Sequence, residues 1–204
     1  MSGAAELLTY GTATLCEAWP SARLIDRPLR PLAPGMAVAG PALTVSCQPG
    51  DNLALHLAIA AARPGDVLVV DYGGSLGSGP FGEIMALASA LRGIAGLVID
   101  GAVRDSAQIA AAGFPVFCLG LNIRGTSKRD PGRIGAALHL GGVEIAAGDL
   151  IVADADAVVC LPGGDLAAAT AACAERAGRE ARMMDRLRAG ETTLDILGLN
   201  GAAP

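Results

Sequence analysis

Two stretches of sequence establish the fold class: Val67-Leu-Val-Val-Asp71-Tyr-Gly-Gly-Ser-Leu-Gly-Ser-Gly-Pro-Phe-Gly82-Glu83, and Gly96-Leu-Val-Ile-Asp100-Gly-Ala-Val-Arg104-Asp105. Each begins as an apolar, β-branched run of strand length and then passes through glycine into a helical segment. Strands that alternate with helices in this way predict a parallel sheet. We therefore expect strands at 67–71 and 96–100 and helices at 82–92 and 105–112.

The same alternation continues from about residue 36 to 161 with no linker, charge block or low-complexity break. The remaining elements are expected at 7–18 (helix), 36–47 (extended, interrupted by Gly40-Pro41), 52–63 (helix capped by Asp51), 115–119 (strand) and 165–188 (long helix). The pattern predicts one α/β domain over residues 1–204, with a core at about 35–165 and a C-terminal helix and tail at about 165–204.

The composition excludes several classes of protein. The chain has 204 residues, of which 52% are hydrophobic and only 17% charged, and its formal net charge is −5. Such a chain is neither disordered nor equipped with the basic surface that nucleic acid requires. The longest charge-free run contains several prolines, so no membrane-spanning helix is expected. Average proteins are roughly 25% charged, which suggests that other subunits cover part of the surface.

The N-terminus and the cysteines predict the cellular location of the protein and the redox state of its thiols. The first residues lack a basic segment followed by an apolar one, which favours a cytoplasmic protein. The five cysteines are widely spaced and form no CxxC pair. We therefore expect reduced, mostly buried thiols.

The C-terminal helix carries a seam of heptad type with one anomalous member. Its positions are Leu166, Thr170, Cys173, Ala177, Glu180, Met184 and Leu187, spaced alternately by four and three residues. A carboxylate in the middle of an otherwise largely apolar seam needs water, a cation or a hydrogen-bond partner. Glu180 is thus a candidate functional residue, or alternatively a solvated glutamate.

The chemistry is expected at the carboxyl ends of the two quoted strands. If these strands are parallel, Gly82, Glu83, Arg104 and Asp105 converge in the crevice where open α/β sheets bind ligands. The helix start at 82–85 could hold a carboxylate or phosphate on its free N–H groups. Arg104 would add a bidentate cation, and Asp105 could hold a divalent metal.

Other interpretations of these residues remain open. Asp105 followed by Gln108 also matches an ordinary capping box, and Arg104 could simply be solvated. The glycine spacing matches neither GxGxxG nor a P-loop, so nucleotide binding is not supported. With only two histidines in the chain, any metal should be oxygen-bound Mg²⁺ or Mn²⁺.

Several ordered motifs together resemble the RraA-like family, which includes 4-hydroxy-4-methyl-2-oxoglutarate aldolase. They are Gly50-Asp-Asn-Leu-Ala-Leu-His56, Pro64-Gly-Asp-Val-Leu-Val-Val-Asp71, Gly82-Glu83, Ile99-Asp-Gly-Ala-Val-Arg104-Asp105 and Ile123-Arg-Gly-Thr126. The resemblance spans about residues 35–197 and implies a layered α/β/α sandwich. Glu83 stands where the family motif has an aspartate, twenty-one positions before Arg104.

The resemblance implies roles for individual residues. Gly82, Glu83, Ile84, Met85 and Arg104 would bind the pyruvoyl part of the substrate, and Asp105 would hold the metal. The catalytic residues would be Arg104, Glu83 and a glutamate from the C-terminal helix of a neighbouring subunit. Glu180 is the candidate for that glutamate, with Glu175 as the fallback.

The implied activity is cleavage of a 4-hydroxy-2-oxo acid to pyruvate by a metal-dependent, class II type aldolase in a homotrimer or hexamer. Decarboxylation of oxaloacetate is expected as a side activity. The only lysine is Lys128, outside the crevice motifs, which disfavours a Schiff-base aldolase. The family also includes regulators that bind and inhibit a ribonuclease, and this is the alternative function.

Overall fold

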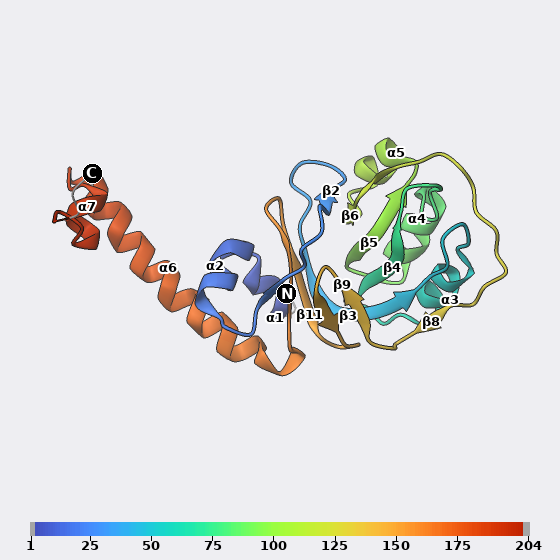
Figure 1. The fold of residues 1–204 in the computed structure, drawn as a ribbon, viewed down its shortest axis with the longest axis horizontal. Coiled ribbons are helices and arrows are strands. Elements are labelled where there is room, and N and C mark those ends of the chain that lie inside the picture. Colours follow the sequence, from blue (N-terminus) through green and yellow to red (C-terminus); the bar gives the residue numbers. More distant parts are fainter. Residues whose placement is uncertain (1–2, 202–204) are drawn as a thin grey trace.

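A ten-stranded sheet runs through the computed structural model, which describes residues 3–201 (Figure 1). Its main path has the order β1-β12-β11-β3-β4-β5-β6-β2, and β7 and β8 pair with β5 and β3. The strands of this sheet are β1 (Arg23–Leu24), β2 (Arg30–Pro31), β3 (Val38–Ser46), β4 (Val67–Ser75), β5 (Gly96–Val103), β6 (Val116–Cys118), β7 (Gly120–Leu121), β8 (Arg133–Ile134), β11 (Leu150–Ala153) and β12 (Val158–Leu161). A separate hairpin is formed by β9 (Leu138–Leu140) and β10 (Val143–Ile145).

Helices cover two separate parts of this sheet, and the predicted α/β fold with a long C-terminal helix is confirmed (Figure 1). They are α1 (Gly3–Leu7), α2 (Gly11–Ala18), α3 (Leu53–Ala61), α4 (Glu83–Leu91), α5 (Ser106–Ala112), α6 (Leu166–Arg188) and α7 (Thr193–Leu197), with a 3₁₀ turn at Gly163–Asp165. Helices α3, α4 and α5 cover the β3–β6 part, whereas α1, α2 and α6 pack over β11 and β12. A third apolar cluster fills the space between the sheet and the β9–β10 hairpin.

The strands β3, β4, β5 and β6 are parallel, as the sequence predicted for the two quoted stretches. Val70 is paired with Ile99, and the register shifts before the next pair, Ser75 with Gly101. Both strands are longer than expected: β4 continues through its first glycines, and β5 continues to Val103. Val103, the last residue of β5, therefore comes directly before Arg104 and Asp105, which were predicted to carry the chemistry.

Two helix starts differ from the expectation. The helix predicted at 7–18 begins only at Gly11, as α2; a turn separates it from the short helix α1, which ends at Leu7 and was not predicted, and Gly11 has a φ of +82°. Helix α3 has Asn52 rather than Asp51 as its N-cap residue. The Asp51 carboxylate still accepts the N–H of Leu53 at 2.8 Å, so it satisfies one free donor of that helix from one position earlier.

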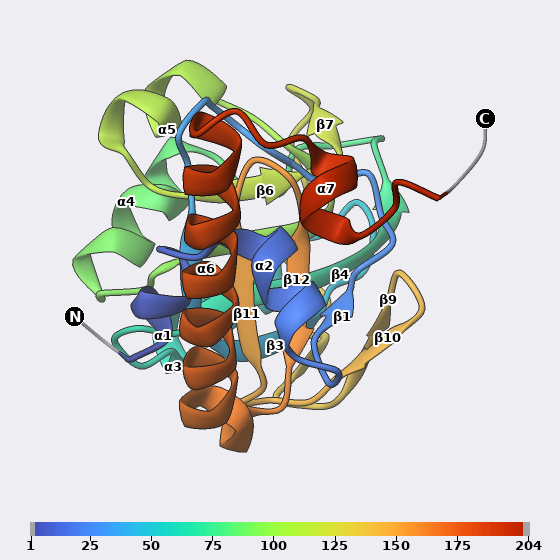
Figure 2. The ribbon, with the colours of Figure 1, turned by 90° about the vertical axis from the view of Figure 1, so that its left-hand side faces the viewer.

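The long C-terminal helix α6 is covered over only part of its length. Its first half packs on α1 and α2, which lie behind it in Figure 2, through Ala169 and Cys173. Its second half projects away from the body (Figure 1). Met184 and Leu187, the last two members of the seam, are exposed. No helix among residues 3–201 combines the length and apolarity needed to cross a lipid bilayer. All five cysteines are free thiols.

Candidate active site

The start of α4 meets the end of β5, as the crevice prediction required. The Glu83 N–H donates to Asp105 Oδ2 at 3.1 Å, and the same oxygen lies 3.7 Å from Arg104 Nε. The Arg104 N–H in turn donates to the carbonyl of Phe81 at 2.9 Å. The structure thus brings together Gly82, Glu83, Arg104 and Asp105 from segments about twenty residues apart.

Gly82 is the N-cap residue of α4, and the site leaves no room for a side chain there. A Cβ at this position would lie 2.9 Å from Arg104 Nε and closer still to Asp105 Oδ2. The backbone itself is extended (φ −144°), a conformation open to any residue. Glycine is required because Arg104 and Asp105 approach the backbone closely, and not because of the local backbone geometry.

The first turn of α4 offers free donors to a ligand. The first helical hydrogen bond runs from the Ala86 N–H to the Gly82 carbonyl at 3.0 Å, so the N–H groups of Ile84 and Met85 have no helical partner. The Ile84 side chain is 81% exposed and that of Met85 is buried. The donors that an anion at this helix N-terminus would use are therefore the backbone N–H groups of these two residues.

Asp105 has a strained backbone. Its φ of 55° and ψ of 41° make it the only non-glycine residue with positive φ among those the structure describes. It precedes α5, yet its carboxylate makes no capping hydrogen bond to that helix. The alternative of an ordinary capping box with Gln108 is wrong, because the carboxylate turns toward α4 instead. Strain of this kind concentrates at functional sites.

The charged groups of this site remain accessible. The Arg104 side chain is 38% exposed and that of Asp105 is 41% exposed. Asp105 Oδ1 takes part in no hydrogen bond among the described residues, so it is free for a ligand. Within residues 3–201, no three His, Cys, Asp or Glu side chains come together in a way that could hold a metal ion. A metal here would have one or two carboxylate ligands and keep several waters, as Mg²⁺ commonly does.

A loop that begins at Asn122 forms one wall of the site. Its Arg124 carbonyl accepts the N–H of Gly79 at 2.9 Å, and Asn122 Nδ2 donates to the Leu76 carbonyl at 2.6 Å. A Cβ on Gly125 would lie 3.9 Å from Arg104 Nη1, which places this loop beside the guanidinium. The Ile123–Thr126 motif contains Arg124, but the hydrogen bonds of this wall are made by the Arg124 backbone carbonyl and by the side-chain amide of Asn122.

Asp51 fastens this loop to the start of α3. Its carboxylate accepts hydrogen bonds from Ser127 Oγ, the Arg129 N–H at 2.8 Å and the Leu53 N–H. Burial alone would raise the pKa of Asp51, but these hydrogen bonds outweigh it and hold the pKa well below its usual range. The loop is therefore held by a carboxylate that is ionised at neutral pH.

Comparison with known proteins identifies the family of the chain. The family model described as RraA-like, Aldolase/RraA, matches residues 12–160. This chain belongs to the RraA-like family. A relative from Halalkalibacterium halodurans, provisionally named 4-hydroxy-4-methyl-2-oxoglutarate aldolase, is 39% identical over 156 residues, which cover 76% of this chain and 74% of the relative.

Solved structures with the RraA-like fold cover most of the chain. An uncharacterised protein from Pseudomonas syringae has a TM-score of 0.84 at 27% identity, over 94% of this chain and 90% of that one. RraAS2 from Streptomyces coelicolor, described as an unusual member of the RNase ES inhibitor RraA family, has a TM-score of 0.78 at 27% identity over 89% and 95%. The RraA-like family thus contains proteins named for two different activities.

Within one chain of this RraA-like protein, Glu180 is not part of the site. It lies on α6, which packs on α1 and α2 over β11 and β12, whereas α4 covers the β3–β6 part of the sheet (Figure 1). Its carboxylate is 2.8 Å from Arg176 Nε, and the same arginine also pairs with Glu17. Glu175, the fallback, pairs with Arg179. Either glutamate could reach a site of this kind only in another subunit.

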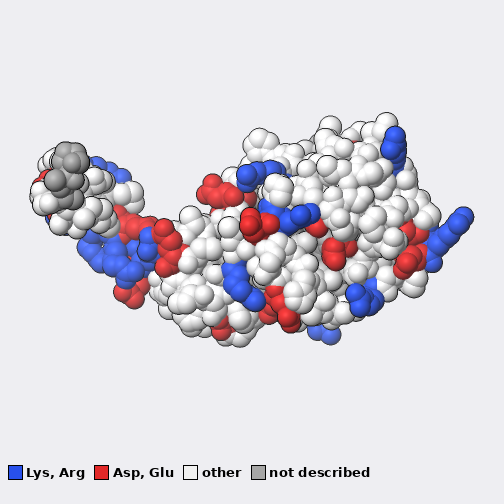
Figure 3. Space-filling model, in the orientation of Figure 1, with Lys and Arg blue, Asp and Glu red and all other residues white. Residues whose placement is uncertain are grey.

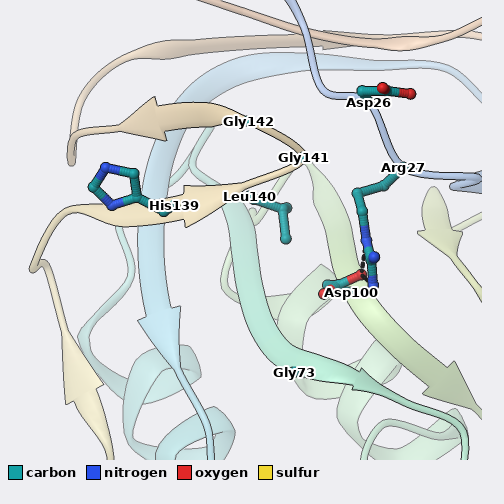
Figure 4. Close-up of a pocket in the computed structure, with 8 residues that line it drawn as sticks. All are labelled: Asp26, Arg27, Gly73, Asp100, His139, Leu140, Gly141 and Gly142. Atoms are coloured by element: carbon teal, nitrogen blue, oxygen red, sulfur yellow. Dashed lines mark hydrogen bonds and ion pairs between the residues drawn. The ribbon is translucent and has the colours of Figure 1, made fainter.

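A separate polar hollow of about 510 Å³ lies at the β9–β10 hairpin (Figure 4). In it Arg27 Nε donates to the buried carboxylate of Asp100 at 2.7 Å, and the two side chains point toward each other. Gly74 allows this approach, since a Cβ there would lie 2.6 Å from Arg27 Nη2. None of the predicted site residues lines this hollow, and we interpret the ion pair as an anchor for the N-terminal segment.

Proposed function

We propose that this protein is a divalent-metal-dependent aldolase of class II type. Its substrate would be 4-hydroxy-4-methyl-2-oxoglutarate or a related 4-hydroxy-2-oxo acid, cleaved to release pyruvate. The observation that carries the proposal is the meeting of free helix N–H groups, Arg104 and the strained Asp105 around a glycine that leaves them room. The name of the Halalkalibacterium relative supports the same activity.

The substrate carboxylate would be held by the N–H groups of Ile84 and Met85 and by the Arg104 guanidinium. These donors face one small region because α4 begins where β5 ends. The helix N-terminus carries a partial positive charge, and arginine offers paired N–H groups that match a carboxylate. The 2-oxo group of the same substrate would then lie toward Asp105.

The donor set fits a hard divalent cation. Asp105 Oδ1 is free, Oδ2 is already oriented by the Glu83 N–H, and the side chain is accessible. Bound there, Mg²⁺ or Mn²⁺ would supply a positive charge that polarises the 2-oxo oxygen. Glu83 follows Gly82 at the helix start and would contact the cation through water or orient that water.

Cleavage requires removal of the proton from the C4 hydroxyl, rupture of the C3–C4 bond, and flow of that electron pair toward the 2-oxo oxygen. Arg104 would stabilise the negative charge that develops in this step. A glutamate that holds a water beside the C4 hydroxyl would accept the proton, and we assign this role to Glu180 of a neighbouring subunit. Protonation at C3 then yields pyruvate, and loss of CO₂ from oxaloacetate needs the same charge stabilisation.

Exposed apolar surface supports an assembly of subunits. The outer side of α4 presents Ile84, Leu87 and Leu91 to solvent at helical spacing, and the projecting end of α6 presents Met184 and Leu187. The visible face of the body has wide uncharged areas (Figure 3). We propose that the α6 end of one subunit lies on α4 of the next in a homotrimer or hexamer, which would bring Glu180 near Glu83.

The metal mechanism is tested by chelation and by reduction. Pyruvate release from oxaloacetate with Mg²⁺, coupled to lactate dehydrogenase, should disappear in EDTA and return when Mg²⁺ is restored. Borohydride added with substrate should leave the activity unchanged, because no lysine among the site residues can form a Schiff base. Full activity in EDTA would rule out the metal mechanism.

The alternative is a regulator that binds and inhibits a ribonuclease. It is favoured by the similarity to RraAS2, which is described as a member of an RNase ES inhibitor family. A regulator needs a binding surface but not a strained aspartate beside an arginine at a helix N-terminus. Purified protein that releases no pyruvate above the metal-only background, yet inhibits a ribonuclease of this class, would favour the regulator.

A further inference from the structure

Two buried side chains from other segments hold the residues that lead into α4. The Asn52 Nδ2 group donates to the Pro80 carbonyl at 2.8 Å, and the Tyr72 hydroxyl lies 2.9 Å from Ser78 Oγ. The same tyrosine hydroxyl accepts the N–H of Gly50 at 2.7 Å. The segment from Ser78 to Gly82 is therefore fastened at two points before the helix begins.

Asn52 contacts both sides of the helix start. Besides Pro80, its amide nitrogen lies 3.6 Å from Met85 Sδ, in the first turn of α4. The residue is only 3% exposed, so water does not compete freely for these contacts. Its orientation is fixed, because a carbonyl oxygen at Pro80 can only accept and must therefore face the NH₂ group.

The other end of the same amide makes no hydrogen bond. Asn52 Oδ1 is buried and has no partner among the described residues. Leaving a buried acceptor unpaired costs at least as much free energy as one hydrogen bond to Pro80 returns. An apolar residue of similar size would exchange this unpaired oxygen for an unpaired Pro80 carbonyl, so the count of unpaired buried groups does not by itself explain an asparagine at this position.

We propose that Asn52 is a positioning residue for the substrate carboxylate. It acts by fixing the position of the Pro80 carbonyl, and through it the position of the first turn of α4. The inference rests on the proposed function for its kinetic consequence. Without the Asn52 amide, the backbone of residues 79–85 would take up a different position. The N–H groups of Ile84 and Met85 would then no longer converge with Arg104.

The effect should fall on substrate binding more than on the chemical step. The α4 N–H groups would contact the carboxylate equally in the ground state and the transition state, and loss of such binding raises KM with little change in kcat. A hydrogen bond of this kind contributes about 0.5–1.5 kcal/mol. We therefore expect KM to rise by about three- to tenfold, while kcat stays within about twofold.

The experiment compares Asn52→Leu with Thr44→Val. Thr44 is a matched control because its Oγ1 is also buried without a partner, but it lies in β3 and not at the α4 start. Oxaloacetate decarboxylation with Mg²⁺ gives KM and kcat, and amide hydrogen exchange reports on residues 79–86. Asn52→Leu should raise KM and speed exchange in that segment alone, whereas Thr44→Val should do neither.

If Asn52→Leu fails to fold, Asn52→Ser removes the amide donor by truncation while it keeps a small polar side chain, and it should give the same pattern. An unchanged KM with unchanged exchange in a folded Asn52 variant would overturn the proposal, as would equal effects in Thr44→Val. The exchange measurement needs no turnover. If the wild type proved inactive, faster exchange at 79–86 would still support the positioning role, while the proposed function alone would fail.

Discussion

Replacement of Gly82 by alanine tests the geometry of the site most sharply. The added Cβ would lie 2.9 Å from Arg104 Nε and 3.0 Å from Arg104 Cγ, and closer still to Asp105 Oδ2. Ordinary contacts between such atoms are roughly 3.5–4.0 Å. The Arg104 side chain can swing aside, but the Asp105 carboxylate must move by about 1 Å and would lose the hydrogen bond from the Glu83 N–H.

The expected loss in activity is large. A misplacement of about 1 Å at a catalytic group can reduce the rate by about a hundredfold, which corresponds to about 2.7 kcal/mol of transition-state stabilisation. Stability should change by less than about 1 kcal/mol, because the extended backbone at Gly82 accepts alanine and the reduced chain entropy offsets the lost hydrogen bond.

The assay is the kcat/KM of Mg²⁺-dependent pyruvate release from oxaloacetate, with urea unfolding as the measure of stability. Gly77→Ala is the control, since this glycine lies in the same loop, has no positive φ, and a Cβ there would meet only Ser75 Oγ at 3.6 Å. It should keep nearly full activity. A folded Gly82→Ala protein with more than about a third of wild-type kcat/KM would refute the proposed close approach of Arg104 and Asp105.

Three further predictions follow from other parts of the molecule. At pH 8 a disulfide reagent should label at most Cys16 in the native protein and all five thiols after denaturation, because the other four are buried. Asp51→Asn should destabilise the protein at pH 7 and only somewhat less at pH 3; because the pKa of Asp51 lies well below its usual range, its contribution is complete above about pH 4 and is lost only as pH falls toward that lowered pKa. Mixing inactive Arg104→Ala and Glu180→Gln subunits should restore about a quarter of the activity if Glu180 acts across subunits; no recovery would contradict that role.

The sequence was sufficient to predict the site wherever the relevant signals were local. The β-branched run before Asp71 and the one before Gly101 predicted two parallel strands, and parallel strands bring their carboxyl ends to one edge. That rule alone placed Gly82, Arg104 and Asp105 together. The seam on the C-terminal helix likewise predicted α6 to within one residue at its start.

Other features depended on packing that local sequence does not specify. The left-handed backbone of Asp105 arises because its carboxylate bonds to α4, twenty-two residues earlier in the chain, and a capping-box pattern gave no sign of it. Asn52 carried no separate signal, since its partner Pro80 lies twenty-eight residues later in the chain. The contact of Tyr72 with Ser78 spans only six residues, but no local pattern indicated it. The seam also could not reveal that only the first half of α6 is covered within one chain.

The central claim is that Arg104 and Asp105, at the junction of α4 and β5, perform the cleavage. The most direct measurement is pyruvate release from 4-hydroxy-4-methyl-2-oxoglutarate in saturating Mg²⁺ by the wild type, Arg104→Ala and Asp105→Ala, each first shown to be folded. The account predicts steady release of two pyruvates per substrate by the wild type and only the metal-only rate for both variants. Equal rates for the wild type and either folded variant would contradict it.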